Sequence, residues 1–125
     1  MDATRIAQHD SNDCRKVSRV LARVGEKWTV LVVMLLRTGP RRFNEIKRMI
    51  GGISQQMLTR TLKGLERDGM VTRTVHPTVP PQVEYALTAL GHSLSEPVKA
   101  LGEWATTNMA VIEEARGRYD ERVDL

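Results

Sequence analysis

The segment 53–68 carries two kinds of side chain on opposite sides of a helix. At 100° per residue, Leu58, Leu62 and Leu65 fall on one side. The opposite side is polar and cationic, with Gln56, Thr59, Arg60, Lys63 and Arg67. Gln can hydrogen-bond adenine, Arg and Lys can reach guanine or phosphate, and the Thr methyl can touch thymine. These residue types suit contact with the base edges of DNA, although an ordinary solvated helix face has the same pattern.

The residues around this helix fit a helix-turn-helix. Ser54 stands at the expected N-cap and Gly69 at the expected C-cap. Gly51 and Gly52 form a turn after a shorter helix over 45–50, for which Asn44 is the expected N-cap. Two helices joined by a Gly-containing turn, the second with two unlike faces, are typical of this motif.

Two alternating segments follow the pair of helices. Residues 70–76 and 82–87 alternate as strands do, and the prolines within 77–81 exclude a helix between them. This pattern predicts a β-hairpin with a rigid tip. A hairpin placed directly after a helix-turn-helix is a wing. A brief strand is also expected at 41–43.

Apolar periodicity predicts three further helices. The first runs from about residue 13 to 24 and places four apolar residues on one stripe, Val17, Val20, Leu21 and Val24. The second, over 27–37, is apolar on most sides, which predicts the centre of the core, although its β-branched residues also fit a strand. The third follows Thr88, and we expect it to kink or restart at Pro97 and to fade near Gly117.

The sequence thus predicts a mainly α-helical α+β fold with a small β-hairpin, a winged helix-turn-helix with N- and C-terminal helices. We divide its 125 residues into a flexible arm over 1–12, one domain over 13–113 and a frayed tail over 114–125. The formal net charge is +4. Between residues 37 and 63, Glu45 is the one acidic residue among the basic residues Arg37, Arg41, Arg42, Lys47, Arg48, Arg60 and Lys63. This concentration of positive charge suits a polyanionic partner.

The residue sets that enzymes and metal sites need are absent or scattered. The sequence has no paired carboxylates, no Ser/His/Asp set and no phosphate-binding loop, so we expect neither an enzyme nor a cofactor. The three histidines and one cysteine are too far apart to suggest a metal site. One cysteine excludes an intrachain disulfide, and no apolar run approaches the ~20 residues that span a membrane. With no signal peptide at the N-terminus, we expect a cytoplasmic protein without membrane contact.

Four strings carry a family resemblance: Gly25-Glu-Lys-Trp28-Thr-Val-Leu31, Arg42-Phe-Asn-Glu-Ile46, Leu62-Lys-Gly-Leu-Glu-Arg-Asp-Gly69 and Val79-Pro-Pro-Gln-Val-Glu-Tyr-Ala-Leu-Thr88. With them, the chain resembles the HxlR family of bacterial and archaeal winged helix-turn-helix transcription regulators, which have a MarR-like fold. The resemblance covers about residues 14–112, and Glu26 departs from it where a glycine is frequent. It implies a homodimer that binds an inverted-repeat operator in double-stranded DNA. It also implies that the first helix and the last long helix form the dimer.

Residue chemistry and this resemblance together give the candidate DNA contacts. For the major groove we expect Gln55, Gln56, Thr59, Arg60 and Lys63, while Ser54 caps the helix and can also reach a phosphate. At or near the tip of the hairpin, we expect contacts to the sugar-phosphate backbone or minor groove from Arg73, His76 and Gln82. Arg41 and Arg42 are candidate phosphate clamps, unless Arg42 pairs with Glu45 instead.

Cys14 has two interpretations. In some members of the resembled family, a cysteine near this position senses quinones, aldehydes or hypochlorite. The start of a helix beside Arg15 and Lys16 favours the reactive thiolate. Without a second cysteine in the chain, a sensor would act through an intersubunit disulfide, alkylation or a mixed disulfide. The alternative is a small buried apolar residue.

Two functions stay open at this point. The first is a sequence-specific, dimeric DNA-binding transcription regulator that responds to redox state, an electrophile or another small molecule. The second is a winged-helix protein-interaction module that binds no DNA, because this fold serves both uses. A nonspecific chromosome-associated protein is a more distant third.

Overall fold

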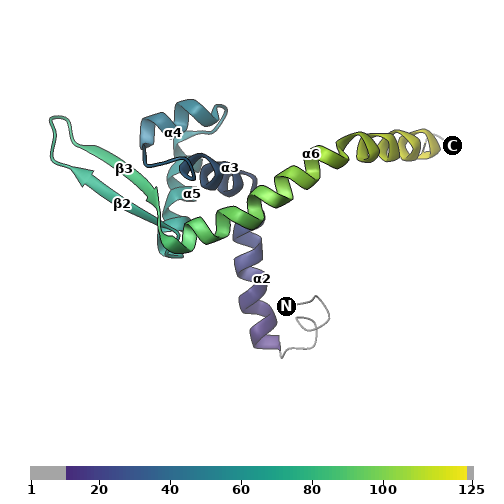
Figure 1. Cartoon of the computed structure of the whole chain (residues 1–125), viewed down its shortest axis with the longest axis horizontal. Coiled ribbons are helices and arrows are strands. Elements are labelled where there is room, and N and C mark those ends of the chain that lie inside the picture. The colour runs from purple at the N-terminus through teal and green to yellow at the C-terminus, as the bar shows by residue number, and fades with distance from the viewer. Residues whose placement is uncertain (1–10, 124–125) are drawn as a thin grey trace.

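The computed structural model describes residues 11–123 and confirms the predicted winged helix-turn-helix, a mainly helical α+β fold (Figure 1). Its elements follow the order α2 (Ser11–Gly25), α3 (Lys27–Leu36), β1 (Arg41–Arg42), α4 (Phe43–Ile50), α5 (Gln55–Arg67), β2 (Val71–His76), β3 (Gln82–Leu87) and α6 (Ala89–Val123). We call residues 27–87, from α3 to β3, the winged-helix body. Residues 1–10 of the predicted arm lie outside the described residues.

The core of the body forms around α3. The segment is a helix rather than a strand, and Thr29, Val32, Val33 and Leu36 are buried on it. Leu31 of the same helix is exposed. Buried apolar residues of the next two helices pack into the same cluster: Ile46 from α4 and Leu58, Leu62 and Leu65 from α5. The apolar side of α5 therefore faces α3 as predicted, and its polar side faces outward.

The wing is part of a three-stranded antiparallel sheet in the order β1-β3-β2. Arg73 pairs with Tyr85, and His76 pairs with Gln82 at the far end of the hairpin. Val71, Tyr85 and Leu87 are buried against the core, which anchors the base of the hairpin. The loop between the strands extends away from the helices (Figure 1).

The start of α4 differs from the prediction. Asn44 is not the N-cap, because the helix already begins at Phe43 and Arg42 occupies the cap position. Glu45, three residues on, accepts a hydrogen bond from the backbone N–H of Arg42 at 3.1 Å. A glutamate at this position can satisfy the cap residue's own N–H, so the helix starts earlier than Asn44 would allow.

The turn and the start of α5 follow the prediction. Gly51 and Gly52 both have positive φ, 68° and 71°, which L side chains rarely adopt. Ser54 caps α5, since its Oγ accepts a hydrogen bond from the backbone N–H of Met57 at 3.0 Å. These two features fix the angle at which α5 leaves the turn.

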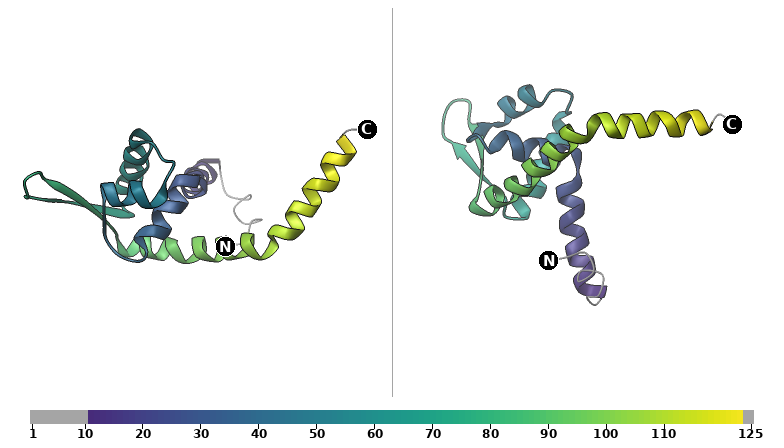
Figure 2. Two further views of the ribbon diagram at one scale, coloured as in Figure 1. Left: turned by 90° about the horizontal axis from the view of Figure 1, so that it is seen from above. Right: turned by 45° about the vertical axis from the view of Figure 1, so that its right-hand side comes forward.

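Two helices leave the body in different directions, α2 and the distal part of α6 (Figures 1 and 2). The first part of α6 packs on the body, where Ser95 and Val98 are buried. Pro97 lies inside α6 and does not restart it. Figure 2 shows a bend further on, in the yellow-green stretch. Two side chains of α6 bond to the preceding turn: Thr106 Oγ1 donates to the Gly102 carbonyl and Asn108 Nδ2 to that of Trp104.

The predicted end of the last helix near Gly117 is wrong, because α6 continues to Val123. One glycine costs a helix only about 1 kcal/mol. The flanking residues are good helix formers, and Arg118 donates to Glu114 at 3.3 Å, one turn earlier. The division into a domain and a separate tail at residue 114 stays a prediction.

Candidate nucleic-acid interface

The five side chains predicted for the major groove lie together on α5. Gln55, Gln56, Thr59, Arg60 and Lys63 line one shallow depression on its outer face. Thr59 is half-buried and the other four are exposed. Arg60 and Lys63 form no ion pair with any residue of 11–123, so both cations are available to an external partner.

Ser54 borders this surface at the N-terminus of α5. Its oxygen accepts the hydrogen bond from Met57, while its own O–H stays available to donate. Ser54 is exposed, so a phosphate oxygen can approach it together with the backbone N–H groups of the first turn. Capping the helix and contacting phosphate are therefore compatible uses of this residue.

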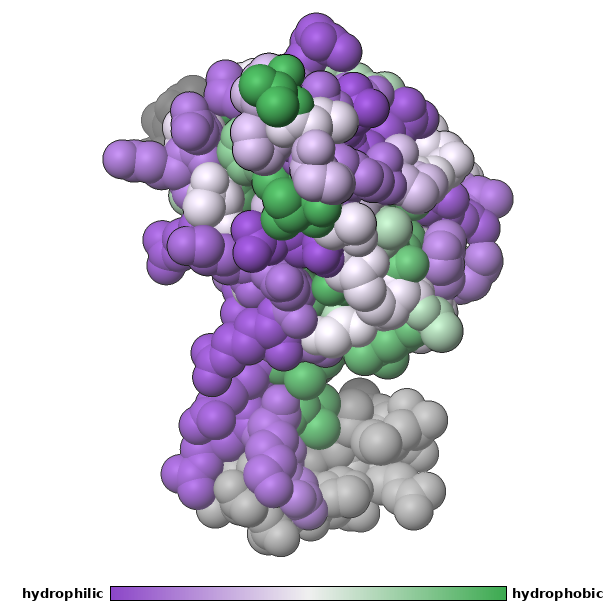
Figure 3. Space-filling model, turned by 90° about the vertical axis from the view of Figure 1, so that its left-hand side faces the viewer, coloured by the Kyte–Doolittle hydropathy of each residue, from purple (hydrophilic) through white to green (hydrophobic). Residues whose placement is uncertain are grey.

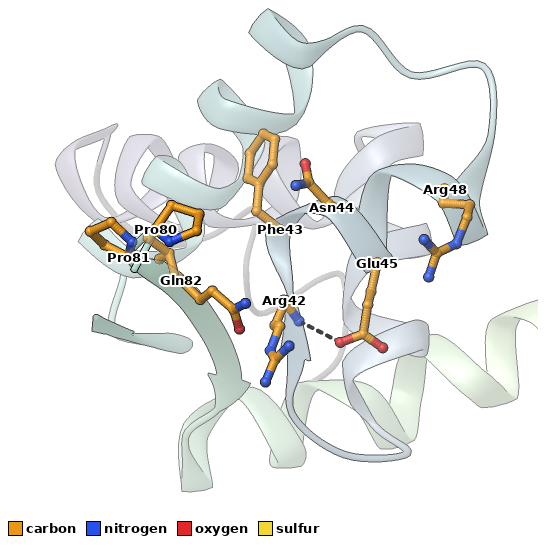
Figure 4. A pocket seen from close by; sticks show the side chains of 9 residues that line it. Arg42, Phe43, Asn44, Glu45, Arg48, Pro80, Pro81 and Gln82 are labelled. Atoms are coloured by element: carbon orange, nitrogen blue, oxygen red, sulfur yellow. Dashed lines mark hydrogen bonds between the residues drawn. The ribbon is translucent and has the colours of Figure 1, made fainter. Parts of the chain in front are cut away.

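A second polar surface lies between α4 and the wing. Figure 4 shows the pocket formed there by the N-terminal part of α4 and the start of β3; it is lined by Arg42, Phe43, Asn44, Glu45, Arg48, Pro80, Pro81, Gln82 and Val83. Arg42 and Gln82 extend from the paired strands β1 and β3. Arg42 and Arg48 are exposed and form no ion pair within residues 11–123. This pocket thus joins two available guanidinium groups to an amide of the wing.

Arg41 is held within the protein. Its Nη1 lies 3.8 Å from Glu45 Oε2, and its Nη2 donates to Thr38 Oγ1 at 3.2 Å. The predicted alternative of an Arg42–Glu45 side-chain pair is therefore corrected: the ion pair uses Arg41, and Arg42 contributes its backbone N–H. A phosphate would have to compete with Glu45 and Thr38 for Arg41, which makes Arg42 the more accessible of the two.

The three predicted contacts of the wing do not lie together. His76 and Gln82 face each other at the far end of the strands, and His76 Nε2 lies 3.6 Å from Glu84. Arg73, which was predicted at or near the tip, lies in the middle of β2, with its Nε 3.9 Å from Glu66 Oε2 of α5. Strand register decides this difference, because Arg73 lies three residues before His76 and therefore nearer the base of the hairpin.

Seen from the side of the wing, the surface is mostly hydrophilic, with its hydrophobic side chains in small separate groups (Figure 3). A surface of this kind suits a polar partner more than an apolar one.

Sequence reasoning missed two cations beside these surfaces. Arg48 lines the pocket next to Arg42, and Lys27 shares another depression with Arg60. Lys27 Nζ also lies 4.5 Å from the ring centroid of Trp28. The signal for Arg48 was its place in the basic segment 37–63, and for Lys27 its place next to Trp28.

Cys14 does not belong to α5 but to α2, about forty residues earlier in the sequence. It is half-buried in the first turn of α2. Within residues 11–123, no three His, Cys, Asp or Glu side chains lie where they could hold a metal ion. In the same range, no helix is long and apolar enough to cross a membrane.

A family model described as HxlR-like helix-turn-helix matches residues 23–113. The chain belongs to this HxlR-like family. The match confirms the resemblance seen in the sequence and includes every predicted DNA contact, whereas Cys14 lies before it. The contacts themselves stay predictions.

Known relatives of this HxlR-like protein are described as helix-turn-helix transcription regulators. The chain is 45% identical over 103 residues to the uncharacterized HTH-type transcriptional regulator YtfH of Escherichia coli (strain K12), which covers 82% of this chain and 79% of that protein. Among solved structures, it is similar to the redox regulator HypR in its reduced form, with a TM-score of 0.74 and 40% identity over 79% of this chain and 98% of that chain. It is also similar to reduced YodB from B. subtilis, with a TM-score of 0.64 and 38% identity over 72% of this chain and 88% of that chain. None of these comparisons favours a winged-helix module that binds no DNA.

Proposed function

We propose that this HxlR-like protein is a homodimeric transcription regulator that binds an inverted-repeat operator in double-stranded DNA. The observation that carries the proposal is the outer face of α5, where two amides, a threonine and two cations that form no ion pair within residues 11–123 make one surface. In a helix-turn-helix, the second helix enters the major groove and its side chains contact base edges. The residues present are those that read adenine, guanine and thymine there.

Each candidate residue has a role that follows from its place. Gln55, Gln56 and Thr59 would contact bases, while Arg60 and Lys63 would contact guanine or phosphate. Ser54, Arg42 and Arg48 would hold phosphates on either side of α5, and His76 and Gln82 would touch the backbone or minor groove beside the wing. Arg41 and Arg73 would mainly support these residues, since both already lie beside a glutamate. The proposed role requires neither catalysis nor a cofactor. It also implies that the protein is located with the DNA in the cytoplasm.

Exposed apolar side chains on the two projecting helices support the dimer. Val20 and Leu21 of α2 are exposed, as are Leu101, Trp104 and Met109 of α6. Large exposed apolar residues on neighbouring turns are typical of a surface that a partner covers. A second copy that uses the same helices would place two α5 helices in one assembly. One helix reads only a few base pairs, so two copies are needed for useful specificity.

A mobility-shift titration tests the proposal. The probe is the DNA upstream of the gene, with an unrelated duplex of equal length as the control, at two salt concentrations. We expect tight binding to the first duplex and weaker binding to the second, both falling as salt rises. Weak binding without sequence preference at both salt concentrations would instead favour a protein-interaction module or a nonspecific chromosome-associated protein.

We further propose that oxidants or electrophiles act on the regulator through Cys14. The structural similarity to HypR, which is a redox regulator, favours this second role. Cys14 is half-buried in α2, a helix we assign to the dimer, so modification there would change how the two copies meet. Because the chain has one cysteine, an oxidised dimer would carry a disulfide between two copies of Cys14 or a mixed disulfide with a small thiol.

The test compares DNA affinity of the wild type and Cys14→Ser before and after treatment with diamide or a quinone. We expect the treatment to change the affinity of the wild type only, and non-reducing electrophoresis to show whether a cross-linked dimer forms. An unchanged wild-type affinity after complete modification of the thiol would reject Cys14 as a sensor.

A further inference from the structure

Arg23, near the C-terminal end of α2, reaches the recognition helix α5. Its Nε donates to Asp68 Oδ2 at 3.0 Å, in an ion pair whose side chains are 27% and 34% exposed. Asp68 is the C-cap residue of α5 and lies 45 positions away in the sequence. The pair therefore connects the N-terminal projecting helix to the far end of the helix that carries the candidate base contacts.

Gly64 supplies the space that this arginine occupies. It is buried and lies among the middle turns of α5, where a glycine weakens a helix relative to alanine. Its φ is not positive, so backbone geometry does not require a glycine here. A Cβ at this position would lie 2.7 Å from Cζ and 3.2 Å from Nη2 of Arg23. The missing side chain thus leaves room for the guanidinium group against the backbone of α5.

Asp68 is a second residue that α5 alone does not favour. A carboxylate at the C-terminus of a helix opposes the helix dipole. The cap itself is made by the backbone: Gly69 N–H donates to the Glu66 carbonyl at 3.0 Å, and Met70 N–H to that of Leu65 at 2.9 Å. The aspartate side chain is therefore not needed to end the helix. Gly64 and Asp68 both become favourable once the Arg23 guanidinium lies beside them.

We propose that Arg23 is a positioning residue for DNA recognition, which fixes the angle between α2 and α5. The inference rests on the proposed function, because it matters for operator choice only if α2 joins two copies on DNA. In such a dimer, the angle of each α5 against its own α2 sets how the two recognition helices are spaced and rotated. Arg23 then contributes to the preferred distance between half-sites without contacting a base.

A spacing assay tests this role on DNA. The preferred duplex is first selected from a random pool and then lengthened or shortened by one base pair between its half-sites. One base pair turns one half-site by about 34° relative to the other, since the duplex repeats every 10–10.5 base pairs. We expect the wild type to prefer the selected spacing and Arg23→Leu to lose most of that preference, while its affinity for an isolated half-site changes less than about twofold. The lysine variant R23K should restore part of the preference, because it keeps the charge but not the planar fork.

The matched control is Arg19→Leu. Arg19 lies about one turn earlier on α2, is exposed and forms no ion pair with any residue of 11–123. We expect this variant to keep the wild-type spacing preference. If Arg23→Leu lowers binding to all three spacings by one common factor, Arg23 only stabilises the protein and the positioning role is wrong.

Thermal unfolding tests the contact without DNA, so it separates this inference from the proposed function. In the Arg23→Leu background, Gly64→Ala should raise the unfolding midpoint by about 3–6 °C, since alanine is the better helix former and the large guanidinium is gone. In the wild type the rise should be clearly smaller or absent, because the new methyl group displaces Arg23 from its ion pair with Asp68. An equal rise in both backgrounds would overturn the contact. A rise that depends on the background, without any DNA binding, would keep the contact and reject the DNA-binding function.

Discussion

The winged-helix body and the projecting helices differ in how far their large apolar side chains are exposed. In the body, Leu58, Leu62 and Leu65 of α5 are almost completely buried against α3. On the projecting helices, Leu101 is 61% exposed and Trp104 57% exposed. The body therefore has a complete core within one chain, whereas α2 and the distal part of α6 expose apolar side chains that a second copy would cover. Folding and assembly should consequently respond to different substitutions.

The largest effect is expected in the core of the body. Leu58→Ala removes a side chain with no exposed surface and should lower the free energy of unfolding by about 2–5 kcal/mol. Denaturant unfolding at several protein concentrations measures this loss. The loss should be similar at all of them, and a strong concentration dependence would show that the body is not stable by itself.

Trp104→Ala should instead weaken the proposed dimer. A large aromatic residue at the centre of an interface typically contributes 2 kcal/mol or more, so the dissociation constant should rise by about 30-fold or more. Analytical ultracentrifugation measures it, with Val75→Ala on the exposed face of the wing as the control. An unchanged constant for Trp104→Ala would mean that this part of α6 is not in the interface.

Gln56→Ala sharpens the comparison within the body, because it alters the proposed DNA-facing surface and not the core. We expect a loss of about 1–3 kcal/mol on the preferred operator and relaxed preference at one base pair. Binding to nonspecific DNA should stay the same. Equal losses on both kinds of DNA would contradict the assignment of Gln56 to base contact.

Lys63→Ala should weaken binding to all sequences. If Lys63 neutralises one phosphate, the slope of log affinity against log salt should become shallower by about one unit. Fluorescence anisotropy over a series of salt concentrations measures the slope. Lys99→Ala is the matched control and should leave the salt slope unchanged. Lys99 lies on α6, away from the face of α5, and its Nζ is 3.9 Å from Glu103 of the same helix.

The smallest effect concerns Tyr85, which is buried in the sheet at the base of the wing. Burial raises the pKa of its hydroxyl above the ordinary value of 10.0, an effect that nearby Arg73 partly offsets and Glu66 reinforces. Above pH 10 the unfolded chain releases this proton while the folded chain retains it, so stability falls as pH rises through the folded pKa. Thermal unfolding between pH 8 and about 11 should show this fall in the wild type, and a smaller one in Tyr85→Phe.

Local patterns were sufficient to predict much of the body. The alternation of Leu58, Leu62 and Leu65 with polar residues placed both faces of α5 correctly, because helix periodicity is a property of neighbouring residues. Ser54 was recognisable as a cap for the same reason, since its partner Met57 is three residues away. The predicted interface on α5 follows from such short-range rules.

Contacts between distant segments were not predictable in this way. Arg41 and Arg42 are adjacent in β1, which pairs with the distant strand β3, and of the two only Arg41 forms an ion pair with Glu45 within residues 11–123. The contact of Arg23 with Gly64 and Asp68 joins residues more than forty positions apart. A glycine weakens a helix relative to alanine, and the structure supplies a reason for Gly64 in the Arg23 guanidinium that lies against it.

The outer face of α5 has a consequence for how such regulators diverge. Gln55, Gln56, Arg60 and Lys63 are exposed and lie outside the hydrophobic core. Substitutions at positions of this kind usually change folding stability by less than about 0.5 kcal/mol. If this face contacts DNA as proposed, mutation there can alter the recognised operator at little risk to the fold. Gene duplication followed by changes at these few positions would give a new regulator on an unchanged scaffold, provided that Gly64 and its arginine are retained together.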